Sequence, residues 1–101
     1  MSRRAARVDG NQTDIVSALE AVGASVQSLA AVGAGCPDLL VGFRGVNFVI
    51  EVKDPTQPAC KRRLNSHQKP WHTNWQGKAH LVETVEQALL IVGAVKQGRA
   101  A

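Results

Sequence analysis

Three ionisable residues lie within a short, otherwise apolar stretch, and their types suit the binding of a divalent cation. The stretch is GCPDLLVGFRGVNFVIEVK, residues 35–53, and the three residues are Asp38, Glu51 and Lys53. Mg²⁺ is commonly held by one or two carboxylates and keeps several of its waters. The two acids and the lysine therefore form a candidate metal site, provided that the chain brings them together.

A β-hairpin is the element that we expect to position them. Residues 39–43 and 46–52 are rich in β-branched and aromatic side chains, as strands are. Arg44 and Gly45 between them read as the turn, although arginine is not an ideal first residue of a two-residue loop, where φ is positive. A three-residue loop, with Gly45 in the left-handed conformation, is the alternative.

The length of that loop decides whether the acids meet. With two residues in the loop, Asp38 lies directly opposite Glu51, with Cβ atoms roughly 4.5 to 5.5 Å apart, and Lys53 lies on the same face. Like charges placed opposite each other are destabilising, so this register favours a cation between them. With three residues, the register shifts by one and separates the acids unless a bulge restores the pairing.

The sequence around these residues resembles a known family of nucleases. PD at 37–38 followed by EVK at 51–53 is similar to the PD-(D/E)XK signature of metal-dependent nucleases, and residues 11–89 resemble the small VRR-NUC branch. The resemblance implies an α/β fold of the α+β sandwich type, in which a mixed central sheet is flanked by helices in the order αβββαβα. It also implies hydrolysis of DNA phosphodiester bonds with Mg²⁺, or with Mn²⁺ as a substitute. The implied metal ligands are Asp38, Glu51 and the main-chain carbonyl of Val52.

The resemblance gives catalytic roles to two further side chains. Lys53 would orient or deprotonate the attacking water or neutralise the transition state, and Gln68 stands where such nucleases often carry Gln or Lys on a later helix. The pattern Asn65-x-x-Gln68 also has the form of a capping box, in which the Gln68 amide binds the backbone of Asn65. Both roles of Gln68 remain open at this point.

One position departs from the family pattern. Such nucleases usually carry a further acid on the first helix, where this chain has Gln12. Gln12 offers a carbonyl oxygen but no negative charge, which weakens any second metal site. A catalytically weak or inactive nucleic-acid-binding module is therefore the alternative function.

A zinc site is a third interpretation, although no zinc-finger or ribbon spacing is present. Its candidate ligands are Cys36, Cys60, His67, His72 and His80.

The charge of the chain favours a polyanionic partner. Twelve Lys and Arg against eight Asp and Glu give a net charge of +4, as in many nucleic-acid-binding domains. A run of three cations ends the loop at residues 54–63, directly after the acids. Such a run is usually a solvated face, but beside a metal site it is well placed to hold phosphates. The residues expected to contact DNA are Lys61, Arg62, Arg63 and Lys69.

The expected substrate is branched or duplex DNA. The resemblance suggests cutting of four-way (Holliday) junctions or other branched DNA by a homodimer, whose twofold axis would present two sites to two strands. The chain contains four aromatic residues and no Tyr, so few rings are available to stack on the bases of a single strand. A helix is expected at 65–76, or from a later start, because Pro70 suits only a first turn. Trp71 and Trp75 lie four residues apart on it, a spacing that predicts packing in the core.

A single domain at residues 11–97 is expected after a basic arm at 1–10, since 101 residues supply one core. No apolar segment suits a secretory signal or a membrane span. We therefore expect a cytoplasmic protein of a bacterium or a phage-infected cell, with free thiols.

The loop at 30–36 contains Gly33 and Gly35, which serve either a turn or the close approach of another segment. Other expected elements are helices at 11–22 and 84–95, and strands at 24–29 and 79–83.

Overall fold

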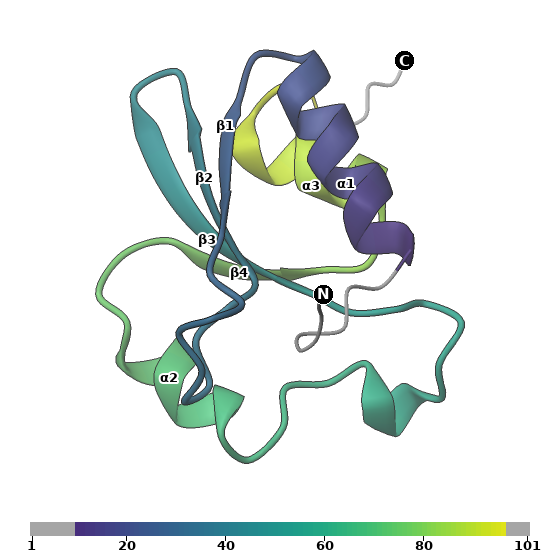
Figure 1. The fold of residues 1–101 in the computed structure, drawn as a ribbon, viewed down its shortest axis with the longest axis vertical. Helices are drawn as coiled ribbons and strands as arrows, with labels where there is room; N and C mark the ends of the chain where they lie inside the picture. The colour runs from purple at the N-terminus through teal and green to yellow at the C-terminus, as the bar shows by residue number, and fades with distance from the viewer. Residues whose placement is uncertain (1–9, 97–101) are drawn as a thin grey trace.

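The computed structural model describes residues 10–96, in which helices lie on a four-stranded mixed sheet (Figure 1). The order of helices and strands predicted from the sequence, αβββαβα, is confirmed, with one added 3₁₀ turn, η1. The predicted basic arm lies outside the described residues except for Gly10, which begins the first helix. The elements are α1 (Gly10–Ala21), β1 (Ser25–Ser28), β2 (Leu39–Phe43), β3 (Val46–Val52), η1 (Ala59–Lys61), α2 (Gln68–Asn74), β4 (Ala79–Val82) and α3 (Val85–Val92).

The sheet has the order β1-β2-β3-β4, antiparallel from β1 to β3 and parallel between β3 and β4. Helices α1 and α3 lie side by side against the sheet, whereas α2 lies apart from them, beside the loop that joins β1 to β2 (Figure 1). The last five residues of β3 are all buried, as expected of a central strand covered on both faces. The largest fully buried side chains are Ile15, Leu19, Leu39, Ile50, Val41 and Val82, together with Pro37.

The β2–β3 hairpin has the two-residue loop. Phe43 pairs with Val46, and Arg44 and Gly45 between them have φ values of 51° and 81°. Positive φ at both positions is what a tight hairpin turn with the twist of its strands requires. Arg44 adopts this conformation, and its guanidinium carbon lies 4.7 Å from the centroid of the Phe43 ring. This is a cation–π contact. The register therefore follows the first of the two alternatives.

Several helix ends differ from the sequence prediction. Helix α2 begins at Gln68, the later start that Pro70 indicated, because proline is tolerated only in the first turn of a helix, and it ends at Asn74 rather than at residue 76. Helix α3 ends at Val92, so its predicted extension to residue 95 is wrong. Gly93 ends it in the left-handed conformation, with φ of 88°, a common helix stop. None of the helices in residues 10–96 is long and apolar enough to cross a membrane.

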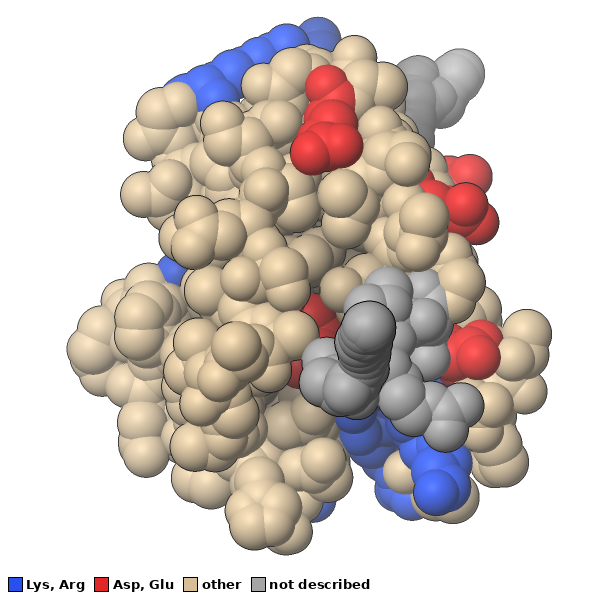
Figure 2. Space-filling view, in the orientation of Figure 1, with Lys and Arg blue, Asp and Glu red and all other residues tan. Residues whose placement is uncertain are grey.

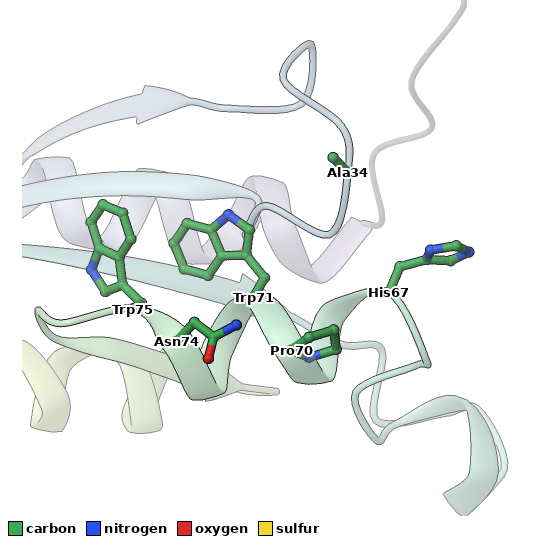
Figure 3. Close-up of a pocket in the computed structure, with 6 residues that line it drawn as sticks. All are labelled: Ala34, His67, Pro70, Trp71, Asn74 and Trp75. Atoms are coloured by element: carbon green, nitrogen blue, oxygen red, sulfur yellow. The ribbon is translucent and has the colours of Figure 1, made fainter.

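The prediction that Trp71 and Trp75 pack in the core is wrong. Helix α2 has no buried residue, and Trp75 is 47% exposed. The two rings lie side by side on one flank of α2 (Figure 3). Since α2 lies away from the layer formed by α1 and α3, its apolar face is not covered by that layer.

Candidate active site

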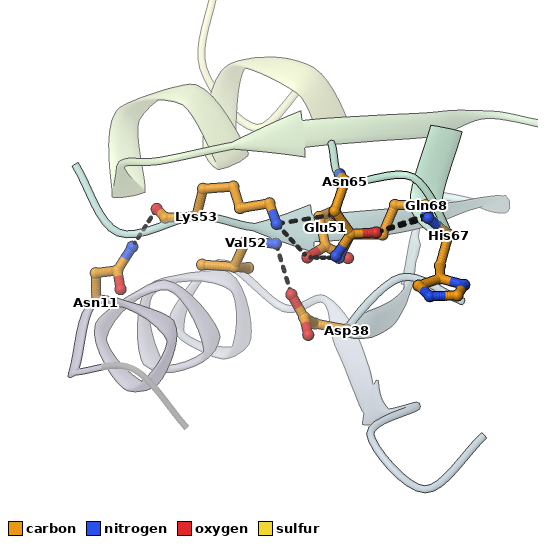
Figure 4. A network of polar contacts seen from close by, with 8 residues as sticks. All are labelled: Asn11, Asp38, Glu51, Val52, Lys53, Asn65, His67 and Gln68. Carbon is orange, nitrogen blue, oxygen red and sulfur yellow. Dashed lines mark hydrogen bonds and ion pairs between the residues drawn. The ribbon is translucent and has the colours of Figure 1, made fainter. Parts of the chain in front are cut away.

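Asp38 and Glu51 come together at the end of the hairpin opposite its turn. The register that pairs Leu39 with Ile50 places Asp38, the residue before β2, across from Glu51. The main-chain N–H of Val52 donates a hydrogen bond of 2.7 Å to Oδ2 of Asp38 (Figure 4). This bond holds the Asp38 carboxylate across the end of β3, beside the Glu51 side chain.

The main-chain carbonyl of Val52 points toward the same region. In an extended strand, the N–H and C=O groups of one residue face the same neighbouring strand. The Val52 N–H faces Asp38, whereas the next amide, that of Lys53, donates to the carbonyl of Val82 in β4 across 2.9 Å. The Val52 carbonyl is therefore directed to the side of β3 on which the Asp38 carboxylate lies.

The Glu51 carboxyl is buried, with 4% of the residue exposed. Its Oε2 accepts a hydrogen bond of 2.9 Å from Nε2 of Gln68 and lies 3.5 Å from Nζ of Lys53. Its Oε1 is buried and finds no hydrogen-bond partner within residues 10–96. Burial, and next the negative charge of Asp38, raise the pKa of Glu51 to about 7 against the opposing effect of Lys53. A buried carboxyl in this setting favours either a proton or a cation.

Gln68 forms the capping box that the sequence suggested and also contacts two of the predicted catalytic side chains. Its Oε1 accepts from the main-chain N–H of Asn65 at 2.9 Å, and Oδ1 of Asn65 accepts from the N–H of Gln68 at 2.9 Å, which is the reciprocal pattern of a capping box. The same Oε1 also accepts from Nζ of Lys53 at 2.9 Å, while Nε2 reaches Glu51 (Figure 4). One amide therefore fixes the start of α2 and binds two of the predicted catalytic side chains.

The loop before Asp38 packs closely against the start of α2. Gly35 has φ of 83°, and a Cβ at this position would collide with the carbonyl oxygen of His67. Glycine thus serves the close approach of two segments, one of the two uses considered for this loop. The neighbouring Cys36 is half-buried, and burial, Glu51 and Asp38 raise the pKa of its thiol.

The predicted DNA contacts differ in their surroundings. Lys61, Arg63 and Lys69 are exposed, whereas Arg62 is half-buried and its Nη1 lies 3.5 Å from Oε1 of Glu83. On the face shown in Figure 2, only a small area of Asp and Glu atoms is visible near the centre, and Lys and Arg atoms lie together below it. Cations are thus exposed near the segment that carries η1 and α2.

Helix α1 contributes a contact that the sequence did not reveal. Nδ2 of Asn11 donates to the carbonyl of Lys53 at 2.8 Å and to that of Glu83 at 3.2 Å. This amide ties the start of α1 to the ends of β3 and β4. Gln12, which stands in place of the family's acid, is buried on the same turn. The sequence pattern suggested Asn11 only as a helix cap and did not indicate this contact, because its partners lie far away along the chain.

The zinc candidates do not form a cluster. Within residues 10–96, no three His, Cys, Asp or Glu side chains are grouped as a metal site would need, and Cys36 and Cys60 are free thiols. Asp38 and Glu51 instead offer two carboxylates, one of them with a buried oxygen that lacks a partner. Such a donor set fits an ion that takes few carboxylates and keeps waters, as Mg²⁺ does.

Comparisons with known proteins support the fold. No protein-family model matches the chain, and no curated protein sequence gives a significant match. A solved structure described as a VRR_NUC domain superimposes with a TM-score of 0.62 at 26% sequence identity, covering 84% of this chain and 92% of that chain. The chain is similar in fold and sequence to this VRR-NUC nuclease domain. The match supports a nuclease domain, and hence a nuclease-type hydrolase.

Four predicted catalytic side chains of this VRR-NUC-like domain are close together although they come from three parts of the chain. Asp38 precedes β2, Glu51 and Lys53 lie at the end of β3, and Gln68 begins α2 (Figure 4). The bonds from Gln68 to Glu51 and to Lys53 link α2 to the central strand. The VRR-NUC fold thus gathers two acids, an ammonium group and an amide at one end of the sheet.

Proposed function

We propose that this VRR-NUC-like domain is a metal-dependent DNA endonuclease that hydrolyses phosphodiester bonds. The observation that carries the proposal is the buried Glu51 carboxyl opposite Asp38, whose Oε1 lacks a partner within residues 10–96. Two acids in this arrangement disfavour each other unless one carries a proton or a cation lies between them, and we take the cation as the functional state. Asp38, Glu51 and the Val52 carbonyl would hold Mg²⁺, and Mn²⁺ would substitute for it.

The chain's own residues prepare the site for phosphate chemistry. When bound, the cation supplies Lewis acidity toward the phosphate and lowers the pKa of water. Lys53 is held between Oε1 of Gln68 at 2.9 Å and Oε2 of Glu51 at 3.5 Å. From this position its ammonium group would orient the attacking water or offset the charge that develops on the phosphate. Gln68 would keep Lys53 and Glu51 in fixed positions relative to each other.

The proposed substrate is branched DNA, including four-way junctions, cut by a homodimer. Residues 55–82 contain five Lys or Arg and no Asp or Glu, which supports binding along phosphates. A chain of 101 residues offers limited surface for a branched substrate. Two copies related by a twofold axis would present two sites to two strands.

The test is cleavage of labelled four-way junction, flap, duplex and single-stranded DNA with Mg²⁺ or Mn²⁺. We expect metal-dependent cutting of the junction, and a loss of about 10²- to 10³-fold in Lys53→Ala, as for removal of one group that stabilises transition-state charge. Lys96→Ala, an exposed lysine after α3, is the matched control and should cut normally. Wild-type protein that binds these DNAs and cuts none of them with either metal would contradict the proposal.

A nucleic-acid-binding module without catalytic activity is the second candidate, and Gln12 in place of an acid is the observation that favours it. Calorimetric titration with Mg²⁺ separates the two. A nuclease should bind Mg²⁺ in a manner that Asp38→Ala abolishes, because Asp38 supplies one of two carboxylates. A binding module should show no Asp38-dependent heat, while it still binds DNA.

A further inference from the structure

Trp71, which is half-buried, and Trp75, which is exposed, form a stacked pair that we call the tryptophan pair. Their ring centroids are 4.6 Å apart and their planes are inclined by 15°. The pair borders a hollow of about 330 Å³ on one flank of α2 (Figure 3). An exposed aromatic stack offers a large flat apolar surface to another ring. The hollow is lined by Ala34, His67, Pro70, Trp71, Asn74 and Trp75.

This hollow continues toward the candidate active site. A second hollow of about 410 Å³ lies beside it, and Ala34 and His67 line both. The second hollow reaches Gln68, whose amide binds Glu51 and Lys53. A ligand seated on the tryptophan pair would therefore extend along the surface to the side chains proposed for catalysis.

The positive charge around the tryptophan pair indicates which class of ligand it would bind. The segment at residues 55–82, which includes all of α2, contains five Lys or Arg and no Asp or Glu. Lys69 and Lys78, on either side of the tryptophan pair in the sequence, are exposed. A ligand that is both polyanionic and made of flat rings is a nucleic-acid strand. The Asn74 amide in the hollow has a donor and an acceptor for the edge of a base.

We propose that the tryptophan pair stacks on an unpaired base of the DNA substrate, close to the phosphate that is cleaved. This inference rests on the proposed nuclease function and adds that the bound DNA has an unpaired base near the cut, either present beforehand or moved out of the stack at the branch point. In a fully paired duplex the faces of the bases are covered by their neighbours, so stacking on protein requires a base outside the stack. The composition had favoured backbone contacts alone, because the tryptophans were expected in the core.

Fluorescence gives a direct readout, because the chain's two tryptophans are the two members of the pair. The protein is titrated in EDTA, which prevents cleavage, with a short single-stranded DNA and with the same strand made abasic at its central nucleotides. Both probes carry the same phosphates. We expect quenching by the intact strand and about 5- to 150-fold weaker binding of the abasic strand, the range for loss of one stacked base. Equal quenching and equal affinity would overturn the proposal.

Variants separate stacking from charge. Trp75→Ala should bind the intact strand as weakly as wild type binds the abasic one, whereas Trp75→Phe should retain most of the affinity because it keeps a ring. Val46→Ala removes an apolar side chain of similar exposure, 39%, at the hairpin turn and should bind like wild type. Circular dichroism checks that each variant is folded. Unchanged binding by Trp75→Ala would refute the inference.

Two further outcomes separate this inference from the proposed function. Cleavage of branched DNA with Mg²⁺, together with quenching that does not depend on bases, would reject stacking and leave the nuclease intact. Base-dependent quenching without any cleavage would support stacking and reject the nuclease. A change of tryptophan fluorescence when the protein alone is diluted would show that a second copy covers the pair, and would overturn the proposal.

Discussion

Nε2 of Gln68 donates a hydrogen bond of 2.9 Å to Oε2 of Glu51, and this bond joins the first residue of α2 to the central strand of the sheet. The same side chain accepts a bond of 2.9 Å from Nζ of Lys53. A neutral amide thus contacts an acid and an ammonium group at once, and presents the correct end to each. Gln68 is therefore a positioning residue for both groups.

Removal of this amide should impair catalysis more than DNA binding. In Gln68→Ala, Lys53 loses its acceptor and Glu51 its donor, so we expect the cleavage rate to fall about 10- to 100-fold, as for other partners that orient metal ligands. Single-turnover cleavage of the best DNA substrate measures the rate, and anisotropy measures binding. Gln76→Ala is the matched control, since Gln76 is exposed near the end of α2 and bonds only weakly, to the Asn74 carbonyl at 3.4 Å. Equal rates for the two variants would argue against this role.

The raised pKa of Glu51 should make the metal-free protein less stable at high pH. Its pKa is about 7 in the folded protein against an ordinary value of 4.5, so between these values the folded state keeps a proton that the unfolded state has released. Stability is then highest below the ordinary pKa and is lost as the pH rises through about 7. The loss over the whole range is on the order of 3 kcal/mol for this shift.

Urea unfolding in EDTA at about pH 5 and about pH 8 tests this linkage. Glu51→Gln is neutral at both pH values and should lack the loss, so it should be more stable than wild type at the higher pH. The histidines His72 and His80 have pKa values lowered by burial and affect both proteins alike. The same pH dependence in wild type and variant would show that Glu51 is not its source.

The hairpin and its acids were predictable from the sequence because they depend on local structure. β2, β3 and the Arg44-Gly45 turn follow from strand propensity and from the spacing of the two runs. Once the two-residue loop is known, the register places Asp38 opposite Glu51 without any further tertiary information. The only local uncertainty was the loop length, because arginine rarely adopts the positive φ found here.

The contacts of α2 were not predictable from sequence spacing, because they depend on where that helix lies in space; only the resemblance to nucleases grouped Gln68 with the acids and Lys53. The spacing of Trp71 and Trp75 is the same for a buried face and for an exposed stack, and the difference arises because α2 is short and lies apart from α1 and α3. The bond from Gln68 to Glu51 likewise requires the start of α2 to pack on the loop at Gly35. Sequence spacing alone carries no signal for such a contact.

The close contact at Gly35 should be essential for the position of Gln68. Gly35→Ala adds a Cβ that would collide with the carbonyl oxygen of His67, so the start of α2 must shift. Gly33→Ala is the matched control: Gly33 also has a positive φ, 72°, but no atom lies within 4 Å of the added Cβ. We expect Gly33→Ala to cost about 1 kcal/mol for its backbone conformation, and Gly35→Ala a further 1 to 3 kcal/mol, roughly, for overpacking.

Urea denaturation gives the stabilities of the two glycine variants, and cleavage assays give their activities at a temperature where both are folded. Gly35→Ala should also lose nuclease activity, because Gln68 no longer reaches Glu51 and Lys53 together. Gly33→Ala should cut at nearly the wild-type rate. If both variants lose stability and activity equally, the contact with His67 has no special importance.

The run Lys61-Arg62-Arg63 should divide into one structural and two DNA-binding residues. Arg62 is half-buried and paired with Glu83 at 3.5 Å, whereas Arg63 is exposed. Arg63→Ala should weaken DNA binding and leave the stability unchanged. The plot of the log of the binding constant against the log of the salt concentration should become less steep by about 0.7 to 0.9, the value for one phosphate contact. Arg62→Ala should instead lower stability by up to about 1 kcal/mol and leave the slope unchanged. Equal slopes for the two variants would mean that Arg62 leaves Glu83 to bind phosphate when DNA is present.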